Sequence, residues 1–303
     1  EQAAALAPGD RGVRVNLALC RLLLGDFARG LPDYEARLIG KAPVFDVPAW
    51  TGSEPIAGKT VLLHAEQGLG DTIQFARYAA LVRERGARPI LAVQPPLVPI
   101  LGQIAEAVPY DRPLPAHDLH CMMLSLPLYF GTDAATIPAS VPYLAASPEK
   151  ASQWAAWLPR DGRRKVGLVR SGNPAHAENR ARSLPSELVK TLAAPDIAFV
   201  ALQPDARPED FPDLPILLPD IAGFADVAGL IANLDAVVSI DSAVAHLAGA
   251  MGNPLFLLLA SDPDWRWHLD RTDSPWYPTA RLIRQHSPGD WSEVLSALRQ
   301  ALT

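Results

Sequence analysis

Two apolar runs separated by a segment of small residues limit the fold of this chain most strongly. Residues 236–240 and 255–259 are apolar without alternation, which is typical of strands covered on both faces of a parallel sheet. About a dozen residues lie between the two runs, which is enough for a crossover helix. Asp241 and Ser242 favour the start of that helix, and Gly252 favours its end. The stretch therefore predicts a strand–helix–strand unit of an α/β fold.

The start of this helix also brings together residues suited to binding. Asp241, Ser242, Ala243 and His246 fall at the carboxyl end of the first strand. Open α/β sheets bind ligands at that edge, where free helix N–H groups attract anions. His246 follows Ser242 by four residues, so both can face the same side of the first turn. An ordinary helix cap with a histidine nearby explains the same residues, and both interpretations stay open here.

Length and composition narrow the class of protein. The 303 residues suffice for two domains, and a net charge of −6 without a basic run argues against a nucleic-acid partner. Cys20 and Cys121 lie far apart without metal-ligand spacing, which favours a reducing, cytoplasmic compartment. We find neither a signal peptide nor an apolar run of membrane-spanning length. The chain starts at Glu1, so we expect more sequence before it.

Residues 1–40 predict a separate helical segment. Helices are expected over residues 13–24 and 27–39, and the second has an apolar face formed by Phe27, Leu31, Tyr34 and Leu38. The pair resembles one tetratricopeptide repeat, which binds proteins as part of a longer array. A plain helical hairpin packed on the next domain is the alternative.

A glycine-rich turn marks the first α/β domain, expected over residues 41–145. Residues 60–65 predict a buried strand and residues 72–85 a helix. Such a turn suits an anion or a sugar, although its spacing is neither that of a dinucleotide fingerprint nor that of a P-loop. Asp71 is either the cap of the helix or a general base. The turn residues that we expect to support a site are Gln67, Gly68 and Gly70.

A second α/β domain is expected over residues 146–289, and an amphipathic helix over residues 290–303. Its strands alternate with helices, as in a doubly wound sheet. The candidate strands are residues 165–169, 197–202, 216–218, 236–240, 255–259 and 280–284.

Polar residues follow the first of these strands. Ser171 and Asn173 form a turn at the sheet edge, and Arg180 and Arg182 come shortly after it. Arginine is permanently charged and binds phosphate with two parallel hydrogen bonds, so the two arginines suit a diphosphate. A solvated charged loop is the alternative.

The segment from Asp262 to Arg266 allows several interpretations. Asp262-Pro263-Asp264 matches the D-x-D pattern of metal-dependent sugar transferases, but the pattern is short and we do not expect a metal site. Trp265 and Arg266 begin an aromatic loop that either contacts a sugar, a base or an acceptor, or seals a domain interface.

Five short motifs in this order resemble glycosyltransferase family nine, the lipopolysaccharide heptosyltransferase family, in its tetratricopeptide-linked form. The motifs are residues 64–72, 171–176, 182–185, 239–247 and 263–267. The resemblance implies a GT-B fold, in which two doubly wound Rossmann-like domains face each other across a cleft. It also implies inverting transfer without a metal or other cofactor.

The resemblance assigns roles to several of these residues. Asp71 matches the catalytic aspartate, Arg182 matches the phosphate-binding basic residue, and Asp241 to His246 match the helix start. The chain departs from the family pattern at three positions: Leu184 replaces a tryptophan, Ala243 a glycine and Ala177 a lysine.

The implied partners are a nucleotide-sugar donor and an acceptor glycan or protein, which the helical segment would recognise. The rival functions are a non-catalytic binding module built on a degenerate transferase, and a sugar-nucleotide epimerase.

Overall fold

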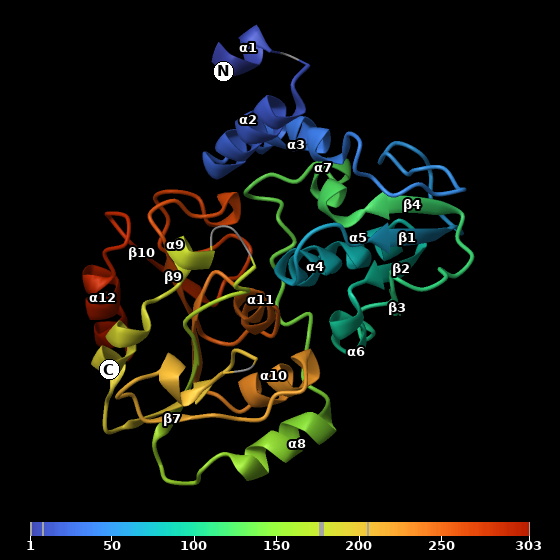
Figure 1. Cartoon of the computed structure of the whole chain (residues 1–303). Helices are drawn as coiled ribbons and strands as arrows, with labels where there is room; N and C mark the ends of the chain where they lie inside the picture. The colour runs from blue at the N-terminus through green and yellow to red at the C-terminus, as the bar shows by residue number, and fades with distance from the viewer. Residues whose placement is uncertain (1, 8, 176–178, 205, 303) are drawn as a thin grey trace. The chain divides into compact units, whose positions relative to one another are not determined.

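The computed structural model describes residues 2–7, 9–175, 179–204 and 206–302. It divides the chain into two compact units (Figure 1). The first unit comprises Glu1–Ala139 and Pro263–Arg271, and the second comprises Ser140–Asp262 and Thr272–Thr303. His176, which belongs to one of the five sequence motifs, lies outside the described residues.

The observed units differ from the predicted domains. The segment from Pro263 to Arg271 was expected in the second α/β domain, residues 146–289, but packs in the first unit. Residues 1–40 were expected as a separate segment but also belong to the first unit. Both differences have one cause, since Phe27 and Tyr34 make edge-to-face ring contacts with Trp265. The C-terminal helix, predicted as a separate element, packs within the second unit.

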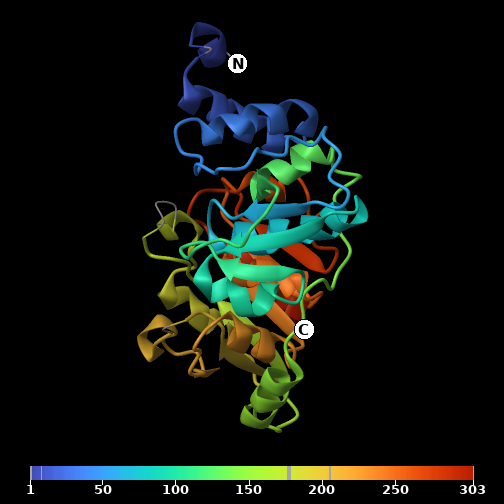
Figure 2. The ribbon, with the colours of Figure 1, turned by 90° about the vertical axis from the view of Figure 1, so that its right-hand side faces the viewer.

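The first unit combines the N-terminal helices with a four-stranded sheet. Helix α3 packs beside α7, and the two are adjacent in Figures 1 and 2. The α-helices are α1 (Gln2–Leu6), α2 (Arg11–Leu23), α3 (Phe27–Tyr34), α4 (Leu69–Phe75), α5 (Ala79–Glu84), α6 (Val98–Leu101) and α7 (Leu126–Tyr129). The 3₁₀ turns are η1 (Glu35–Leu38), η2 (Ala76–Tyr78), η3 (Pro95–Leu97), η4 (Met123–Ser125) and η7 (Trp265–Trp267).

The first sheet is entirely parallel, with the strand order β3-β2-β1-β4. The strand predicted over residues 60–65 is present as β1, whereas β3 is not evident from the sequence. The β3 sequence is Glu-Ala-Val-Pro, which lacks the β-branched run that signals a strand. The strands are β1 (Thr60–His64), β2 (Arg88–Val93), β3 (Glu106–Pro109) and β4 (Leu119–Met122).

Part of one face of this sheet is covered by a connecting segment. Phe45 packs on the cluster of Leu62, Ile90 and Ala92. Its ring also stacks on His120 with centroids 4.0 Å apart. The proline- and glycine-rich connector therefore contributes to the core of the first unit.

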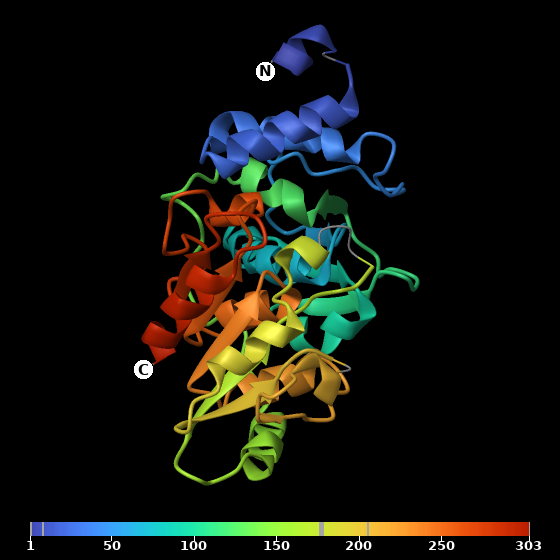
Figure 3. The same cartoon turned by 60° about the vertical axis from the view of Figure 1, so that its left-hand side comes forward.

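The second unit is a six-stranded, wholly parallel sheet with helices. Its order is β10-β9-β8-β5-β6-β7, and Figure 3 shows α12, in red, beside the edge strand β10. The strands are β5 (Arg164–Val169), β6 (Ile197–Ala201), β7 (Ile216–Leu217), β8 (Ala236–Ile240), β9 (Leu255–Leu259) and β10 (Ala280–Arg284). The helices are α8 (Pro148–Trp157), α9 (Asn179–Arg182), α10 (Phe224–Ile231), α11 (Ala243–Ala250) and α12 (Ser292–Leu302), with 3₁₀ turns η5 (Ser186–Leu192) and η6 (Pro208–Asp210).

All six strands predicted for this unit are confirmed, and β8, β9 and β10 have the predicted bounds. Helix α8 was not predicted, because its sequence carries polar and apolar residues without a clear apolar face. It is fixed by Trp154, whose indole N–H donates to Asp226 Oδ1 at 3.1 Å. None of the helices described in the structure is long and apolar enough to cross a membrane.

Candidate functional site

The strand order of the second unit places a switch point between β5 and β8. On one side of this pair the sheet continues through β6, and on the other through β9. Val169 of β5 pairs with Ser239 of β8, so the two strands end side by side. Parallel sheets bind ligands where the order reverses, just outside the carboxyl ends of the strands. Ser171 and Asp241 follow these two strands, and the fold therefore brings the predicted binding residues to one edge.

Ser242 is the N-cap of helix α11. Its hydroxyl accepts the amide of Ala245 at 3.3 Å and lies 2.9 Å from the hydroxyl of Ser239. Ala243 is the first helical residue and is half-buried. The first N–H groups of a helix have no partner within the helix, and the helix dipole favours negative charge there. The start of α11 is therefore suited to an anion.

His246 is buried beneath this helix start, with an exposed fraction of 5%. Its Nδ1 lies 2.9 Å from the Tyr277 hydroxyl, and its Nε2 lies 3.8 Å from Asp241 Oδ1. Gly249 allows the Tyr277 ring to approach, since a Cβ at that position would lie 2.5 Å from the ring. These contacts suit His246 to orienting Asp241 more than to touching a ligand.

A cationic group, the Arg182 guanidinium, lies at the turn that follows β5. A Cβ placed on Gly172 would stand 3.0 Å from Nη2 of Arg182, so the guanidinium lies close to the backbone of this turn. Arg182 Nε is buried without a hydrogen-bond partner among the described residues. The amide of Gly172 donates to Asn179 Oδ1 at 3.0 Å. Sequence reasoning missed Asn179, because nothing in its spacing separates it from a loop residue.

The other predicted residues of this turn differ in their exposure to solvent, and Asn173 and Arg180 are more exposed than Arg182. Asn173 accepts the amide of Ala175 at 2.9 Å, which closes a tight local turn. Ser171 is half-buried, and Arg180 is exposed. Arg182 is therefore the better placed of the two predicted arginines.

In the first unit, helix α4 begins earlier than the sequence predicted. Gly68 is its N-cap and Asp71 lies in its first turn, whereas the helix was expected from Thr72 with Asp71 as one candidate cap. Asp71 Oδ2 accepts the amide of Gly68 at 2.9 Å. Gly68 has a φ of −70°, so it does not provide a left-handed turn. It provides room instead, because a Cβ there would lie 3.0 Å from Asp71 Oδ2.

Asp71 also forms a buried ion pair with Arg266. Its Oδ1 accepts from Arg266 Nη2, and Arg266 Nη1 donates to Asp264 Oδ1 at 2.8 Å. Burial raises the pKa of Asp71, Arg266 opposes this effect, and Asp264 adds to it. The carboxylate is thus closer to proton exchange at neutral pH than an ordinary aspartate.

The structure gives Trp265 and Arg266 a different role from the predicted ligand contact. Both are 4% exposed, and the Arg266 guanidinium carbon lies 4.7 Å from the centroid of the Trp265 ring. Trp265 also packs against Phe75 and Tyr34. Asp264 accepts the Arg266 amide at 3.0 Å, so its carboxylate caps the η7 turn and holds Arg266.

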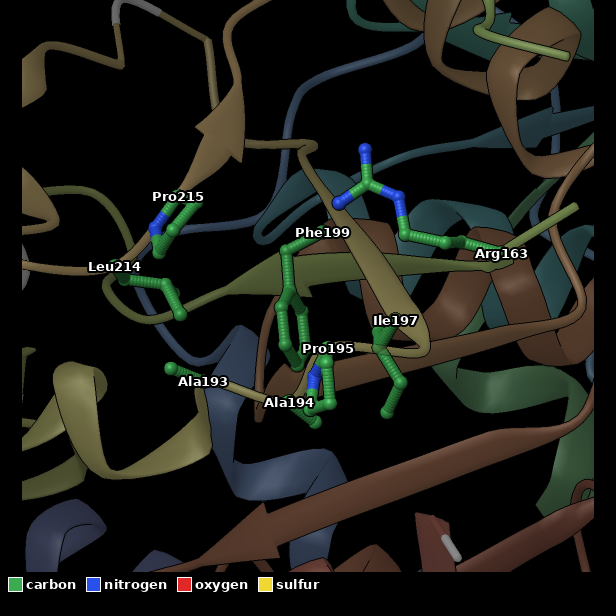
Figure 4. A pocket seen from close by; sticks show the side chains of 8 residues that line it. All are labelled: Arg163, Ala193, Ala194, Pro195, Ile197, Phe199, Leu214 and Pro215. Carbon is green, nitrogen blue, oxygen red and sulfur yellow. The ribbon is translucent and has the colours of Figure 1, made fainter. Parts of the chain in front are cut away.

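A pocket of about 320 Å³ lies at the opposite edge of the second sheet (Figure 4). Arg163, Pro195 and Pro215 line it, and each of them precedes a strand. Apart from Arg163, the lining side chains are apolar. Arg163 is therefore the one charged side chain among the described residues that line this pocket, and none of these residues starts a helix as Ala243 does at the β5–β8 edge.

Comparisons with known proteins agree with this geometry. Residues 216–292 match Glycosyltransferase family 9 (heptosyltransferase). The chain is 27% identical to Protein FlbA of Caulobacter vibrioides over 93% of its own length and 53% of that protein, so it spans about half of this relative.

Three solved structures share the fold. The ADP-heptose lps heptosyltransferase II of E. coli has a TM-score of 0.52 at 18% identity, covering 80% of this chain and 99% of that one. A family 9 glycosyl transferase from Veillonella parvula has a TM-score of 0.55 at 10% identity, covering 82% and 91%. The iron-containing heptosyltransferase TibC, bound to ADP-D-beta-D-heptose, has a TM-score of 0.51 at 13% identity, covering 78% and 65%. The chain therefore has the α/β fold of the heptosyltransferase structures, and its residues 216–292 are similar to glycosyltransferase family 9.

Proposed function

We propose that the chain is a glycosyltransferase that moves a hexose or heptose from a nucleotide-sugar donor to an acceptor hydroxyl, with inversion and without a metal. The observation that carries this proposal is the switch point of the second unit. There Arg182, the last residue of helix α9, lies against the Gly172 turn that follows β5. Strand β5 pairs with β8, and β8 leads into the start of α11. A diphosphate needs this combination of helix N–H groups and a guanidinium.

In the proposed reaction, the acceptor oxygen attacks the anomeric carbon while the bond from that carbon to the diphosphate breaks. The nucleoside diphosphate leaves with an additional negative charge. The start of α11 and Arg182 stabilise this charge. Asp241 lies at the same edge of the sheet, with its carboxylate next to His246. Attack from the face opposite the leaving group inverts the anomeric centre.

Asp71 is proposed as the general base that accepts the proton of the acceptor hydroxyl. Its raised pKa supports this role, because a base works best when its pKa lies near the working pH. Arg266 holds the carboxylate in one orientation and must share it with the incoming hydroxyl.

This role predicts a pH dependence. Ionised Asp71 is the active form, so kcat/KM should rise with pH through an acid limb above about pH 4, the ordinary range of aspartate. Asp264→Asn removes a negative neighbour that raises the pKa of Asp71, so the limb should move to lower pH. The exposed Asp262 offers a matched control, and Asp262→Asn should leave the limb in place. A limb that does not respond to Asp264→Asn would argue against Asp71 as the titrating group.

The donor site gives a second test. Arg182→Ala should weaken the binding of a nucleoside diphosphate by about 1.5–3 kcal/mol, the range for hydrogen bonds to charged groups. Arg163→Ala removes an arginine at the opposite sheet edge and should leave the dissociation constant unchanged. Titration calorimetry with ADP and UDP measures both variants. Equal affinity in Arg182→Ala and the unaltered protein would assign Arg182 to a solvated loop.

Metal independence is a separate expectation, because helix N–H groups and a guanidinium supply the positive charge that a metal would otherwise provide. Donor turnover should persist in EDTA. Turnover that stops with the chelator and returns with manganese would contradict this expectation.

The second candidate function is a non-catalytic binding module. The ion pair that occupies Oδ1 of Asp71 favours it, since a carboxylate held by arginine is a weaker base. Incubation with nucleotide-sugars separates the two functions, because a transferase releases nucleoside diphosphate and a binding module does not.

We also propose that the N-terminal helices contribute to recognition of an acceptor glycan or protein, as a tetratricopeptide-like segment would. The two unbridged cysteines, Cys20 and Cys121, suit action in the reducing cytoplasm.

A further inference from the structure

Tyr34, the last residue of helix α3, contacts the loop that leads into helix α4, and the first turn of that helix carries Asp71. Its side chain is buried, and its hydroxyl accepts a hydrogen bond from Gln67 Nε2 at 2.9 Å. The guanidinium carbon of Arg37 lies 4.8 Å from the centroid of its ring. Arg37 in turn donates to both carboxylate oxygens of Glu66, at 3.1 and 2.9 Å. Two consecutive loop residues, Glu66 and Gln67, are therefore held by the N-terminal helical segment.

Other groups hold the loop as well, since the Glu66 carboxylate accepts the Leu124 amide at 3.2 Å and the Gly68 carbonyl accepts the Thr72 hydroxyl at 3.2 Å. Gln67 and Gly68 are exposed, and the carbonyl of Gln67 accepts from Gln94 Nε2 at 2.7 Å. Gly68 donates its amide to Asp71. The hydrogen bond between Gly68 and the Asp71 carboxylate thus depends in part on how the neighbouring residue Gln67 is held.

Tyr34 reaches Asp71 by a second route as well. Its ring packs edge-to-face on Trp265, with centroids 6.4 Å apart. Arg266 stacks on Trp265 and pairs with Asp71 Oδ1. One side chain therefore supports both groups that bind the Asp71 carboxylate, the Gly68 amide through Gln67 and the Arg266 guanidinium through Trp265.

We propose that Tyr34 is a positioning residue for Asp71, so that the helical segment is part of the reaction centre and not only a recognition element. The inference rests on the proposed function of Asp71 as the general base.

The test uses the full chain and the variant Tyr34→Phe, which keeps the ring on Trp265 and removes the hydroxyl that binds Gln67. We expect kcat to fall about 3–10-fold, the effect of one lost hydrogen bond, while KM for the nucleotide-sugar stays unchanged. Hydrogen exchange at the Gly68 amide should become faster, because its hydrogen bond to Asp71 is less well held. Tyr129→Phe is the matched control. It also removes one tyrosine hydroxyl from this unit, but that hydroxyl donates to Glu35 at 3.4 Å instead of to the loop.

A kcat and a Gly68 exchange rate that match the unaltered protein would overturn the proposal, and so would equal losses in Tyr34→Phe and Tyr129→Phe. If the unaltered protein releases no nucleoside diphosphate from any donor, the proposed function fails instead. Exchange at Gly68 then decides by itself whether Tyr34 positions the loop.

Discussion

The variant Asp71→Asn is expected to transfer sugar about 10²–10⁴-fold more slowly than the unaltered protein, the usual contribution of a general base. It should also unfold at a lower temperature. Asparagine can still accept the Gly68 amide, but it cannot neutralise Arg266, which is 4% exposed. The sequence alone gives no reason for this loss, because the pairing of Asp71 with Arg266 is not visible in it. Losing a hydrogen bond between charged groups costs about 1.5–3 kcal/mol, and Asp264 retains part of the compensation.

Arg266→Gln separates the two roles of Asp71. It removes the same ion pair and should lose similar stability, but it leaves the carboxylate in place. Because Arg266 lowers the pKa of Asp71, the variant should need a higher pH for full activity. Scanning calorimetry and donor turnover at pH 8 measure both effects. If the two variants lose stability and transfer in parallel, Asp71 is a structural residue and the base must be sought elsewhere. Glu66, the next carboxylate in the loop, is then a poor substitute because Arg37 binds both of its oxygens.

Arg37→Ala is expected to destabilise the first unit by about 3–5 kcal/mol, the cost of removing one partner from a buried ion pair. The side chains of Arg37 and Glu66 are only 5% and 8% exposed. Arg37 also donates to the Ser125 hydroxyl at 2.8 Å and pairs with Glu35. Burial raises the pKa of Glu66 and Arg37 opposes this, so loss of the guanidinium leaves a carboxylate that must take up a proton or attract water. Urea unfolding followed by tryptophan fluorescence measures the loss.

Two further variants show that the loss comes from the buried charge. Adding Glu66→Gln to Arg37→Ala removes the uncompensated carboxylate and should restore part of the stability. Arg29→Ala breaks an exposed ion pair with Asp26 in the same helical segment and should cost far less stability than Arg37→Ala. Equal losses in Arg29→Ala and Arg37→Ala would show that Arg37 has no special role.

The same contacts bear on removal of residues 1–40. A separate helical segment, as the sequence predicts it, could be removed near Lys41 without loss of folding or of nucleotide-sugar binding. The structure indicates a larger effect, because this cut removes Arg37 from Glu66 and Phe27 from the Trp265 ring.

The sequence predicted the second unit well because its signals are local. Each strand from β8 to β10 is a five-residue run bounded by turn residues, and Ser242 signals the start of α11 by its type and position. The edge where Arg182 and Asp241 lie follows from strand order, which general rules for parallel sheets supply. The contact between Gly172 and Arg182 could not be predicted in the same way, because it depends on where the arginine side chain lies.

The first unit was harder to predict because its important contacts connect distant residues. Asp71 and Arg266 are 195 positions apart, and Arg37 and Ser125 are 88 apart. A tryptophan followed by arginine in a loop indicates a ligand contact as readily as a buried cluster. Only the fold shows that Phe27, Phe75 and Tyr34 surround Trp265.

The passage of Pro263–Arg271 into the first unit has a consequence for recombination between related genes. The chain leaves the second unit after Asp262 and returns to it at Thr272, so neither unit is encoded by one continuous stretch. A hybrid in which all residues after Ala139 come from a related protein would replace Arg266 and Trp265 together with the second unit. Asp71 would then pair with a residue of the other parent. Hybrids should keep Pro263–Arg271 with the parent that supplies Asp71 and Tyr34. Whether a hybrid keeps the contacts of Asp71 therefore depends on which parent supplies the nine residues Pro263–Arg271, and not on where the two halves are joined.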